Sequence, residues 1–246
     1  MSEISNRVAI VTGASRGIGS AIAGRLAADG YSVVVNYAGN AEAAASVVQG
    51  IQANGGKALS VAADVSSAAG AKALFAAAKD QFGGCDVLVN NAGIMKLASI
   101  RESTDDLFDT QVAVNLKGTV NMLREAAEEL RSGGSIVNLS TSVVGLRLET
   151  YAVYAATKAA VETLGAILAK ELRGRSITVN AIAPGPTATE LFFNGKSEEL
   201  IARLSKANPL ERLGTPEDIA NAVSFLVGSD GRWINGQTLR ANGGLV

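Results

Sequence analysis

The stretch Val8-Ala-Ile-Val-Thr-Gly-Ala-Ser-Arg-Gly-Ile-Gly19 decides the fold of this 246-residue chain. It reads as a short apolar strand, a glycine-rich turn and the start of an alanine-rich helix. Gly13 permits a sharp turn, Gly17 permits close approach of the backbone to a phosphate, and Gly19 permits the helix to pack closely on the strand. Because the helix also presents free backbone N–H groups to an anion, the stretch predicts a dinucleotide site.

The same alternation continues along the chain. Most of the β-branched runs are continuously apolar, as expected of strands covered on both faces. We predict strands at 8–12, 32–36, 58–62, 86–90, 135–139, 177–182 and near 237–240, and helices at 17–29, 41–53, 68–82, 104–131, 151–173, 189–207 and 216–227. This order predicts an α/β Rossmann fold, a doubly wound parallel sheet of about seven strands with helices on both faces. Nothing resembles a linker or a repeat, so residues 1–246 are predicted to form a single domain.

Several helix boundaries are visible in the residues. Thr215-Pro-Glu-Asp218 reads as an N-cap, a first-position proline and first-turn acids. Four glycine positions follow predicted helices and are typical of left-handed helix ends: Gly30, Gly55-Gly56, Gly83-Gly84 and Gly133-Gly134. The helix at 151–173 is small or apolar nearly all round, which predicts burial on several faces, partly against another subunit.

Composition excludes several classes of function. A net charge of −1 without a basic cluster disfavours nucleic acid and anionic membrane surfaces as partners. Residues 1–6 show no secretory signal, and no apolar run approaches the ~20 residues that span a bilayer. A single cysteine, Cys85, fits a reducing, cytoplasmic location. Because the chain has no histidine, Ser-His-Asp hydrolases are excluded and no metal site is predicted.

The second strand indicates which nicotinamide cofactor is bound. It reads Ser32-Val-Val-Val-Asn-Tyr37, with no acid where NAD-binding proteins place Asp or Glu against the ribose hydroxyl. Arg16, inside the glycine turn, offers a guanidinium to a 2′-phosphate. Both observations favour NADP(H); the alternative is that Arg16 is a solvated loop charge.

Tyr154 and Lys158 predict a proton-transfer site. They are four residues apart and therefore share one face of the predicted helix. A free tyrosine has a pKa of about 10, and a neighbouring ammonium lowers that pKa towards a useful range. The alternative is a surface pair on an amphipathic helix.

Taken in order, these residues resemble the short-chain dehydrogenase/reductase family. The resemblance runs from Val8 to Gly244 and also includes Asp64-Val65, Asn90-Asn-Ala-Gly93, Asn115, Pro184-Gly185 and Asn235-Gly-Gln237. The chain is most similar to bacterial NADP-using carbonyl reductases, including 3-oxoacyl-carrier-protein reductases. This implies an NADPH-dependent, reversible reductase that transfers hydride between the nicotinamide and a carbonyl or alcohol. Members are commonly homotetramers.

The resemblance also implies roles for individual residues. Tyr154 would be the general acid/base, Lys158 would also bind the nicotinamide ribose, and Asn115 would help hold a proton-relay water. Asp64 and Val65 would lie against the adenine. The full set of implied cofactor contacts is Gly13, Ser15, Arg16, Gly17, Ile18, Gly19, Asn36, Tyr37, Asp64, Val65, Asn91, Ala92, Gly93, Tyr154, Lys158, Pro184, Gly185, Thr187 and Thr189.

The hydroxyl that would orient the carbonyl oxygen is ambiguous. Counting 13 residues back from Tyr154, the family's usual spacing, selects Thr141. The Ser-x-x-Gly pattern of the loop selects Ser142, which we take as the catalytic serine, with Thr141 second and Ser140 third.

The expected substrate pocket is mainly apolar, which favours a hydrophobic small-molecule carbonyl or alcohol. We expect it to include Ile94, Met95, Leu97, Leu146 to Leu148 and Leu191-Phe-Phe193, with Tyr151 as a further lining residue. These side chains could equally be core or subunit contacts. The Tyr-x-x-x-Lys spacing argues against an enoyl reductase. An alternative from another class is an NADP-binding redox sensor or scaffold without turnover.

Overall fold

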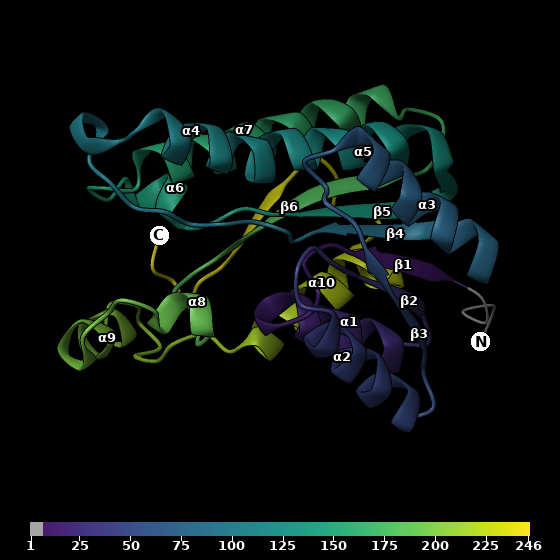
Figure 1. The fold of residues 1–246 in the computed structure, drawn as a ribbon, viewed down its shortest axis with the longest axis horizontal. Coiled ribbons are helices and arrows are strands. Elements are labelled where there is room, and N and C mark those ends of the chain that lie inside the picture. Colours follow the sequence, from purple (N-terminus) through teal and green to yellow (C-terminus); the bar gives the residue numbers. More distant parts are fainter. Residues whose placement is uncertain (1–6) are drawn as a thin grey trace.

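The computed structural model describes residues 7–246 and contains one parallel sheet in the order β3-β2-β1-β4-β5-β6-β7 (Figure 1). Its strands are β1 (Val8–Val11), β2 (Ser32–Tyr37), β3 (Lys57–Ala62), β4 (Cys85–Asn90), β5 (Leu130–Leu139), β6 (Thr178–Pro184) and β7 (Thr238–Ala241). The strand order reverses between β1 and β4, which opens a crevice at the carboxyl ends of the strands. The predicted Rossmann fold is confirmed. Residues 1–6, for which no secretory signal is expected, lie outside the described part.

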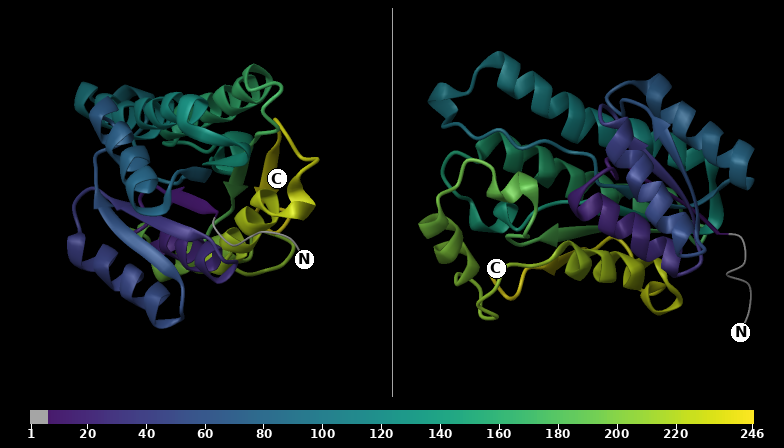
Figure 2. Two further views of the ribbon diagram at one scale, coloured as in Figure 1. Left: turned by 90° about the vertical axis from the view of Figure 1, so that its right-hand side faces the viewer. Right: turned by 60° about the horizontal axis from the view of Figure 1, so that its bottom comes forward.

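Helices cover both faces of the sheet, as Figures 1 and 2 show. One face carries α1 (Gly17–Ala28), α2 (Ala41–Ala53) and α10 (Pro216–Val227), and the other carries α3 (Ala68–Phe82), α5 (Gly118–Glu129) and α7 (Ala152–Glu171). Alternate residues of β1 enter the two hydrophobic cores, because successive side chains of a strand point to opposite faces. Ala9 and Val11 join the first core, and Val8 and Ile10 join the second.

The predicted helix 104–131 is divided and ends early. It consists of α4 (Asp105–Gln111), a π-helical stretch η2 (Val112–Lys117) and α5, after the short helix η1 (Ile100–Glu102). Strand β5 begins at Leu130, so Gly133-Gly134 lies in a strand and the prediction of a helix end there is wrong. A Cβ on Gly134 would lie 2.5 Å from the backbone oxygen of Asp86. Glycine is therefore required for close approach to β4, not for ending a helix.

Other boundary predictions are confirmed. Gly30, Gly55 and Gly83 follow their helices with φ of 93°, 80° and 86°. Thr215 and Asp218 form a reciprocal capping box at the start of α10. A short helix α6 (Val143–Leu146) and the 3₁₀ turn η3 (Ser229–Gly231) were not predicted.

The predicted helix 189–207 is two short helices, α8 (Glu190–Phe193) and α9 (Glu198–Ser205). Gly195 has φ of 72°, a left-handed conformation that stops the first helix. The Ser197 side chain accepts a hydrogen bond from Leu200 N and starts the second. Residues 188–213, here called the lid, extend away from the sheet at the lower left of Figure 1.

Helix α7 is, by length and composition alone, apolar enough to cross a membrane. The sequence expectation concerned unbroken apolar runs, and α7 contains no such run of this length. Its many alanines nevertheless raise its mean hydropathy, which is the property measured here. However, α7 packs along β6 and carries the buried Lys158. These are properties of a helix packed within a folded protein.

Candidate active site

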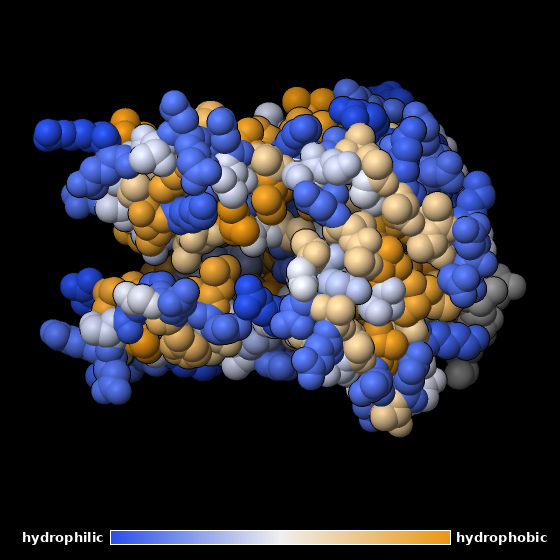
Figure 3. All heavy atoms as spheres, in the orientation of Figure 1, coloured by the Kyte–Doolittle hydropathy of each residue, from blue (hydrophilic) through white to orange (hydrophobic). Residues whose placement is uncertain are grey.

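A cavity of about 330 Å³ opens at the carboxyl ends of the strands. Its walls come from the start of α1, the segments after β4, β5 and β6, helix α7 and the lid. Figure 3 shows the hollow on the left side of the molecule, with hydrophobic side chains on both rims. The size and the apolar lining suit a small organic ligand.

The glycine turn has the backbone conformations that its sequence predicts. Gly13 and Gly17 have φ of 60° and 57°, values that residues other than glycine rarely adopt. A Cβ on Gly13 would lie 2.9 Å from Cα of Ala92, and one on Gly19 would lie 2.5 Å from the oxygen of Gly13. The turn therefore packs directly on the end of β4 and on its own helix.

Two asparagines hold this turn in place. The Asn36 side chain accepts from Gly13 N at 3.1 Å and donates to Ala63 O at 2.9 Å. The Asn91 side chain donates to the carbonyls of Thr12 and Gly13 at 2.9 and 3.0 Å. Both amides are thus bonded to the protein itself, so the structure gives them a role in shaping the turn.

The start of α1 is suited to an anion. The side chain of Arg16, its N-cap residue, makes no capping bond, and the first turn contains no acid. The backbone N–H groups of the first turn of α1 therefore remain available to phosphate oxygens, which fits the pyrophosphate of a dinucleotide. The Arg16 guanidinium pairs with Glu190 of the lid at 3.0 Å, and both side chains are largely exposed. Ser15 and Ile18 lie in the same turn, and Ile18 lines the cavity.

The residues expected at the adenosine end of the cofactor lie at the carboxyl ends of the neighbouring strands β2 and β3. Tyr37 ends β2, and the exposed Asp64 follows β3, where its carboxylate accepts from the Ser66 backbone and hydroxyl. Val65 is buried, and its backbone oxygen accepts from the Asn121 side chain.

Across residues 7–246, no cluster of three or more potential metal-ligating side chains occurs.

Tyr154 and Lys158 face the cavity from the first turns of α7. Burial raises the pKa of the Tyr154 phenol to about 12, while the nearby Thr141 side chain opposes that change and Tyr151 adds to it. Burial lowers the pKa of Lys158 to about 8, and its amino group donates to Leu139 O at 2.7 Å. The expected lowering of the tyrosine pKa is therefore wrong for this structure, because the cost of burying a phenolate outweighs the opposing effects.

Asn115 lies in the π-helical stretch η2 and is fully buried. Its amide accepts from Ile94 N at 2.8 Å and donates to Ile94 O and to the Thr157 hydroxyl. That hydroxyl donates to the carbonyl of Tyr154. A Cβ on Gly93 would lie 3.3 Å from Asn115 Oδ1 and 3.4 Å from Lys158 Nζ, so these groups meet around one glycine.

The three candidate hydroxyls after β5 have different partners. The Ser140 hydroxyl donates to the carboxylate of Glu162. Ser142 is 3% exposed, donates to Ala183 O at 3.2 Å and accepts from Asn242 Nδ2 at 3.0 Å. The Thr141 hydroxyl accepts from Val143 N at 3.3 Å, and the Thr141 side chain is the one of the three whose proximity lowers the pKa of Tyr154.

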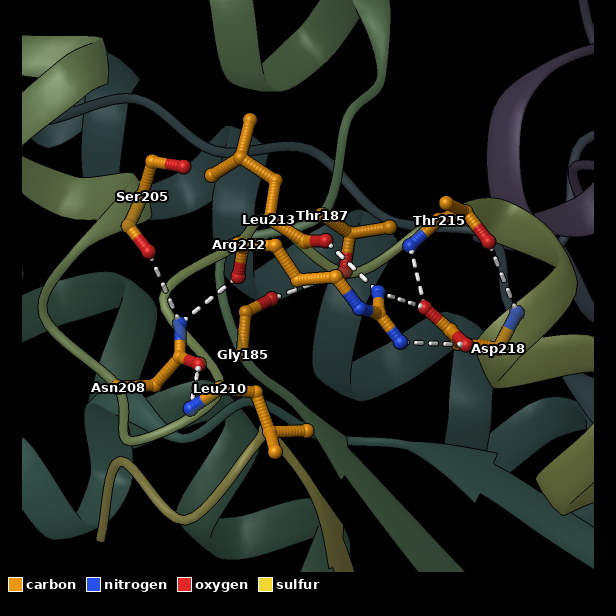
Figure 4. Close-up of polar contacts among 9 residues, drawn as sticks. All are labelled: Gly185, Thr187, Ser205, Asn208, Leu210, Arg212, Leu213, Thr215 and Asp218. Atoms are coloured by element: carbon orange, nitrogen blue, oxygen red, sulfur yellow. Dashed lines mark hydrogen bonds and ion pairs between the residues drawn. The ribbon is translucent and has the colours of Figure 1, made fainter.

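The segment after β6 completes the cavity and carries the lid. Pro184, Gly185, Thr187 and Thr189, which the resemblance implies as cofactor contacts, all line the cavity. Thr187 pairs with Gly214 through a backbone bridge, so the two ends of the lid meet at one point. Figure 4 shows the bonds at this base. Asn208 donates to the carbonyls of Ser205 and Arg212, and Arg212 pairs with Asp218 at 2.6 Å.

Most of the expected substrate residues line the cavity. They are Ile94, Met95, Leu146, Leu148, Tyr151, Leu191 and Phe192. Leu97, Arg147 and Phe193 do not, and Leu97 and Phe193 are 41% and 42% exposed. The cavity also receives Lys196, Leu204, Ala207 and Leu245, which the sequence did not single out because their positions depend on the break in the lid and on the chain's last turn.

Comparison with known proteins agrees with this geometry. Residues 13–246 match the family model described as Enoyl-(Acyl carrier protein) reductase. The chain is 43% identical over 258 residues to an NADPH-dependent aldehyde reductase of Arabidopsis thaliana, covering 99% of this chain and 95% of that one. It is 42% identical over 239 residues to a 3-oxoacyl-[acyl-carrier-protein] reductase of Staphylococcus aureus, covering 96% and 97%.

A solved structure of a short chain dehydrogenase from Burkholderia cenocepacia in complex with NADP superposes with a TM-score of 0.93, at 37% identity over 99% of both chains. This chain belongs to the short-chain dehydrogenase/reductase family. As a member of that family, it is an NAD(P)-dependent oxidoreductase acting on CH–OH or C=O groups. The chain is about equally similar to relatives that are named for different substrates. The cavity is therefore the guide to its own substrate.

Proposed function

We propose that this protein is an NADPH-dependent reductase of hydrophobic carbonyl compounds, with Tyr154 as the general acid. The observation that carries the proposal is that the Tyr154–Lys158 pair and the glycine turn's Ile18 line one cavity. When bound there, NADPH supplies the hydride. The Tyr154 phenol is protonated at neutral pH, so it has a proton to donate to the oxygen of the carbonyl being reduced.

Thr141 is the proposed second donor to the carbonyl oxygen. The Thr141 side chain acts on the pKa of the phenol, and its hydroxyl only accepts a bond, from Val143 N. The Ser142 hydroxyl, in contrast, already donates its proton to Ala183 O and accepts from Asn242. A donor fixed beside the developing oxyanion lowers the barrier most when it needs no reorganisation. This reverses the order favoured by the sequence pattern.

Lys158 and Asn115 are proposed to position the cofactor and the tyrosine. Lys158 is held by Leu139 O, which keeps its remaining N–H groups directed towards the cavity and the nicotinamide ribose. Asn115 links the end of β4 to the first turn of α7 through Thr157. The preference for NADP over NAD rests on Arg16, and on the absence of an acid at the end of β2.

We also propose a homotetramer. Only 28% of the apolar window of α7 is buried, and Ile167 on this helix and Phe108 on α4 are about half exposed. Three further large apolar side chains are exposed near the end of the chain, Phe225, Trp233 and Leu239, of which Trp233 is 98% exposed. A tetramer with two kinds of twofold interface needs two such surfaces on each subunit. Light scattering of Trp233→Glu and Ile167→Glu should each give dimers.

The activity is tested by following the absorbance of reduced nicotinamide with NADPH and, separately, NADH. The panel should contain ketones, aldehydes, 3-oxoacyl thioesters and enoyl thioesters. Turnover of ketones or aldehydes with NADPH supports the proposal. NADPH binding without turnover of any of them would instead indicate a cofactor sensor.

A further inference from the structure

A lysine of the lid lies inside the otherwise apolar part of the cavity. Lys196 belongs to the link between α8 and α9, and it lines the same cavity as Tyr154. The residues that line this cavity include two lysines, Lys158 and Lys196, and not one aspartate or glutamate. Lys158 is held at the catalytic end by Leu139 O, whereas Lys196 enters from the lid. The cavity wall is therefore positively charged at two separate places.

Lys196 has little to balance its charge. Its amino group donates to Phe192 O at 2.7 Å and lies 4.9 Å from the Phe192 ring centre. Throughout the described residues 7–246, no carboxylate lies within 4.0 Å of it. Glu190, an acid of the same lid, pairs with Arg16 instead. Partial burial lowers the pKa of Lys196, which is the response of an ammonium withdrawn from water without a counter-ion.

The position of this ammonium selects a kind of substrate. The cavity that Tyr154 and Lys196 share is lined largely by apolar side chains, such as Leu146 and Leu148 of the body and Leu191 of the lid. A molecule whose carbonyl lies at Tyr154 would place an apolar chain along this wall and its far end near Lys196. A charge-assisted hydrogen bond is strongest where water is partly excluded, so an anion at that far end would gain most.

We propose that Lys196 is a specificity-determining residue that binds an anionic group, a carboxylate or a phosphate ester, at the end of the substrate remote from the carbonyl. The preferred substrates are then apolar keto compounds with a terminal anion. This proposal rests on the proposed reductase function and deepens it. Arg147, which the sequence offers as a contact for an anion, does not line the cavity.

Kinetics with matched substrates test the proposal. Keto acids of increasing chain length, each beside its methyl ester, and one keto phosphate are reduced by wild type, Lys196→Met, Lys196→Arg and Lys206→Met. Lys206 is an exposed lysine at the end of α9 outside the cavity, so it matches the charge change on the same lid. We expect Lys196→Met to lower kcat/KM about tenfold for the anions and less than about twofold for the esters. Lys196→Arg should retain the preference, and Lys206→Met should behave as wild type.

A binding measurement separates failure of this proposal from failure of the reductase function. Octanoate and octanamide have similar shapes and contain no reducible ketone. Calorimetry in the presence of NADP⁺ should show tighter binding of octanoate to wild type and a loss of that difference in Lys196→Met. If wild type binds both probes equally, or if Lys196→Met weakens both equally, the proposal is wrong whether or not turnover occurs. If Lys196→Met instead raises the dissociation constant of NADPH and leaves the binding of both probes unchanged, Lys196 contacts the cofactor and the proposal is wrong.

Discussion

The wall of the cavity formed by β4, β5 and α7 differs from the lid in how its polar groups are held. Lys158 in the wall and Asn115 of η2, which adjoins the wall, are buried and bonded to backbone groups of neighbouring elements. In the lid, Glu190 makes an exposed ion pair, and Lys196 bonds a carbonyl of its own short segment. The difference supports our two proposals, that the wall holds the catalytic groups and that the lid selects the substrate, since precise sites need rigid support.

The largest expected effect is that of removing the phenol from the wall. Tyr154→Phe should lower kcat by about 10²–10⁴-fold, because general acid catalysis contributes on this scale. The NADPH dissociation constant, measured by fluorescence, should change little because the ring and Lys158 remain. A variant that keeps most of its kcat would show that the proton comes from another group.

The second effect distinguishes two hydroxyls of the same loop. Thr141→Val should lower kcat about 10²-fold, the scale for loss of one oxyanion donor. Ser142→Ala should act mainly on stability, lowering the free energy of unfolding by about 1 kcal/mol because Asn242 and Ala183 O lose a buried partner. Kinetics and urea unfolding on both variants make the test. The opposite pattern would return the catalytic role to Ser142.

The third effect concerns the ion pair between the turn and the lid. Arg16→Ala should weaken NADPH binding about tenfold and leave NADH binding nearly unchanged, because only NADPH carries a 2′-phosphate. The matched variant Glu190→Gln removes the competing carboxylate and should tighten NADPH binding by no more than about twofold, since exposed pairs contribute little. Equal losses for both nucleotides after Arg16→Ala would mean that this residue only shapes the turn.

The fourth effect is a pH dependence of stability caused by Lys158. Its folded-state pKa of about 8 is below the ordinary value of 10.5, so between these values the unfolded chain binds a proton that the folded chain lacks. This group therefore makes the free energy of unfolding rise as pH increases from about 8 to 10.5, and it adds no slope at lower pH. Urea unfolding across this range should show a smaller rise for Lys158→Met than for wild type or Lys206→Met. An unchanged slope would contradict the assignment.

The sequence predicts the wall better than the lid, for a physical reason. Buried strands are continuous apolar runs, and the glycines of the turn are required by positive φ or close approach, so both leave local patterns. The i+4 spacing of Tyr154 and Lys158 likewise determines that they share a helix face. These features depend on few distant contacts.

What the sequence missed depends on three-dimensional partners. The raised tyrosine pKa reflects burial, and the bonds of the Ser142 hydroxyl come from β6 and from Asn242, 100 residues away. The single helix expected at 189–207 is interrupted at Gly195, whose φ of 72° ends the first of two shorter helices. The position of Lys196 in the cavity depends on that interruption, so the sequence pattern did not predict it.

The bridge between Thr187 and Gly214 has a consequence for how such enzymes diversify. Because the lid leaves and rejoins the body at one pair of residues, its length and sequence are nearly independent of the sheet. The entropy of closing such an excursion grows only slowly with its length. An insertion or an exchanged segment between Glu190 and Gly214 would therefore alter the range of compounds accepted while Thr189 and the Arg16–Glu190 pair stay in place, which makes this part of the lid a natural module for laboratory recombination between relatives.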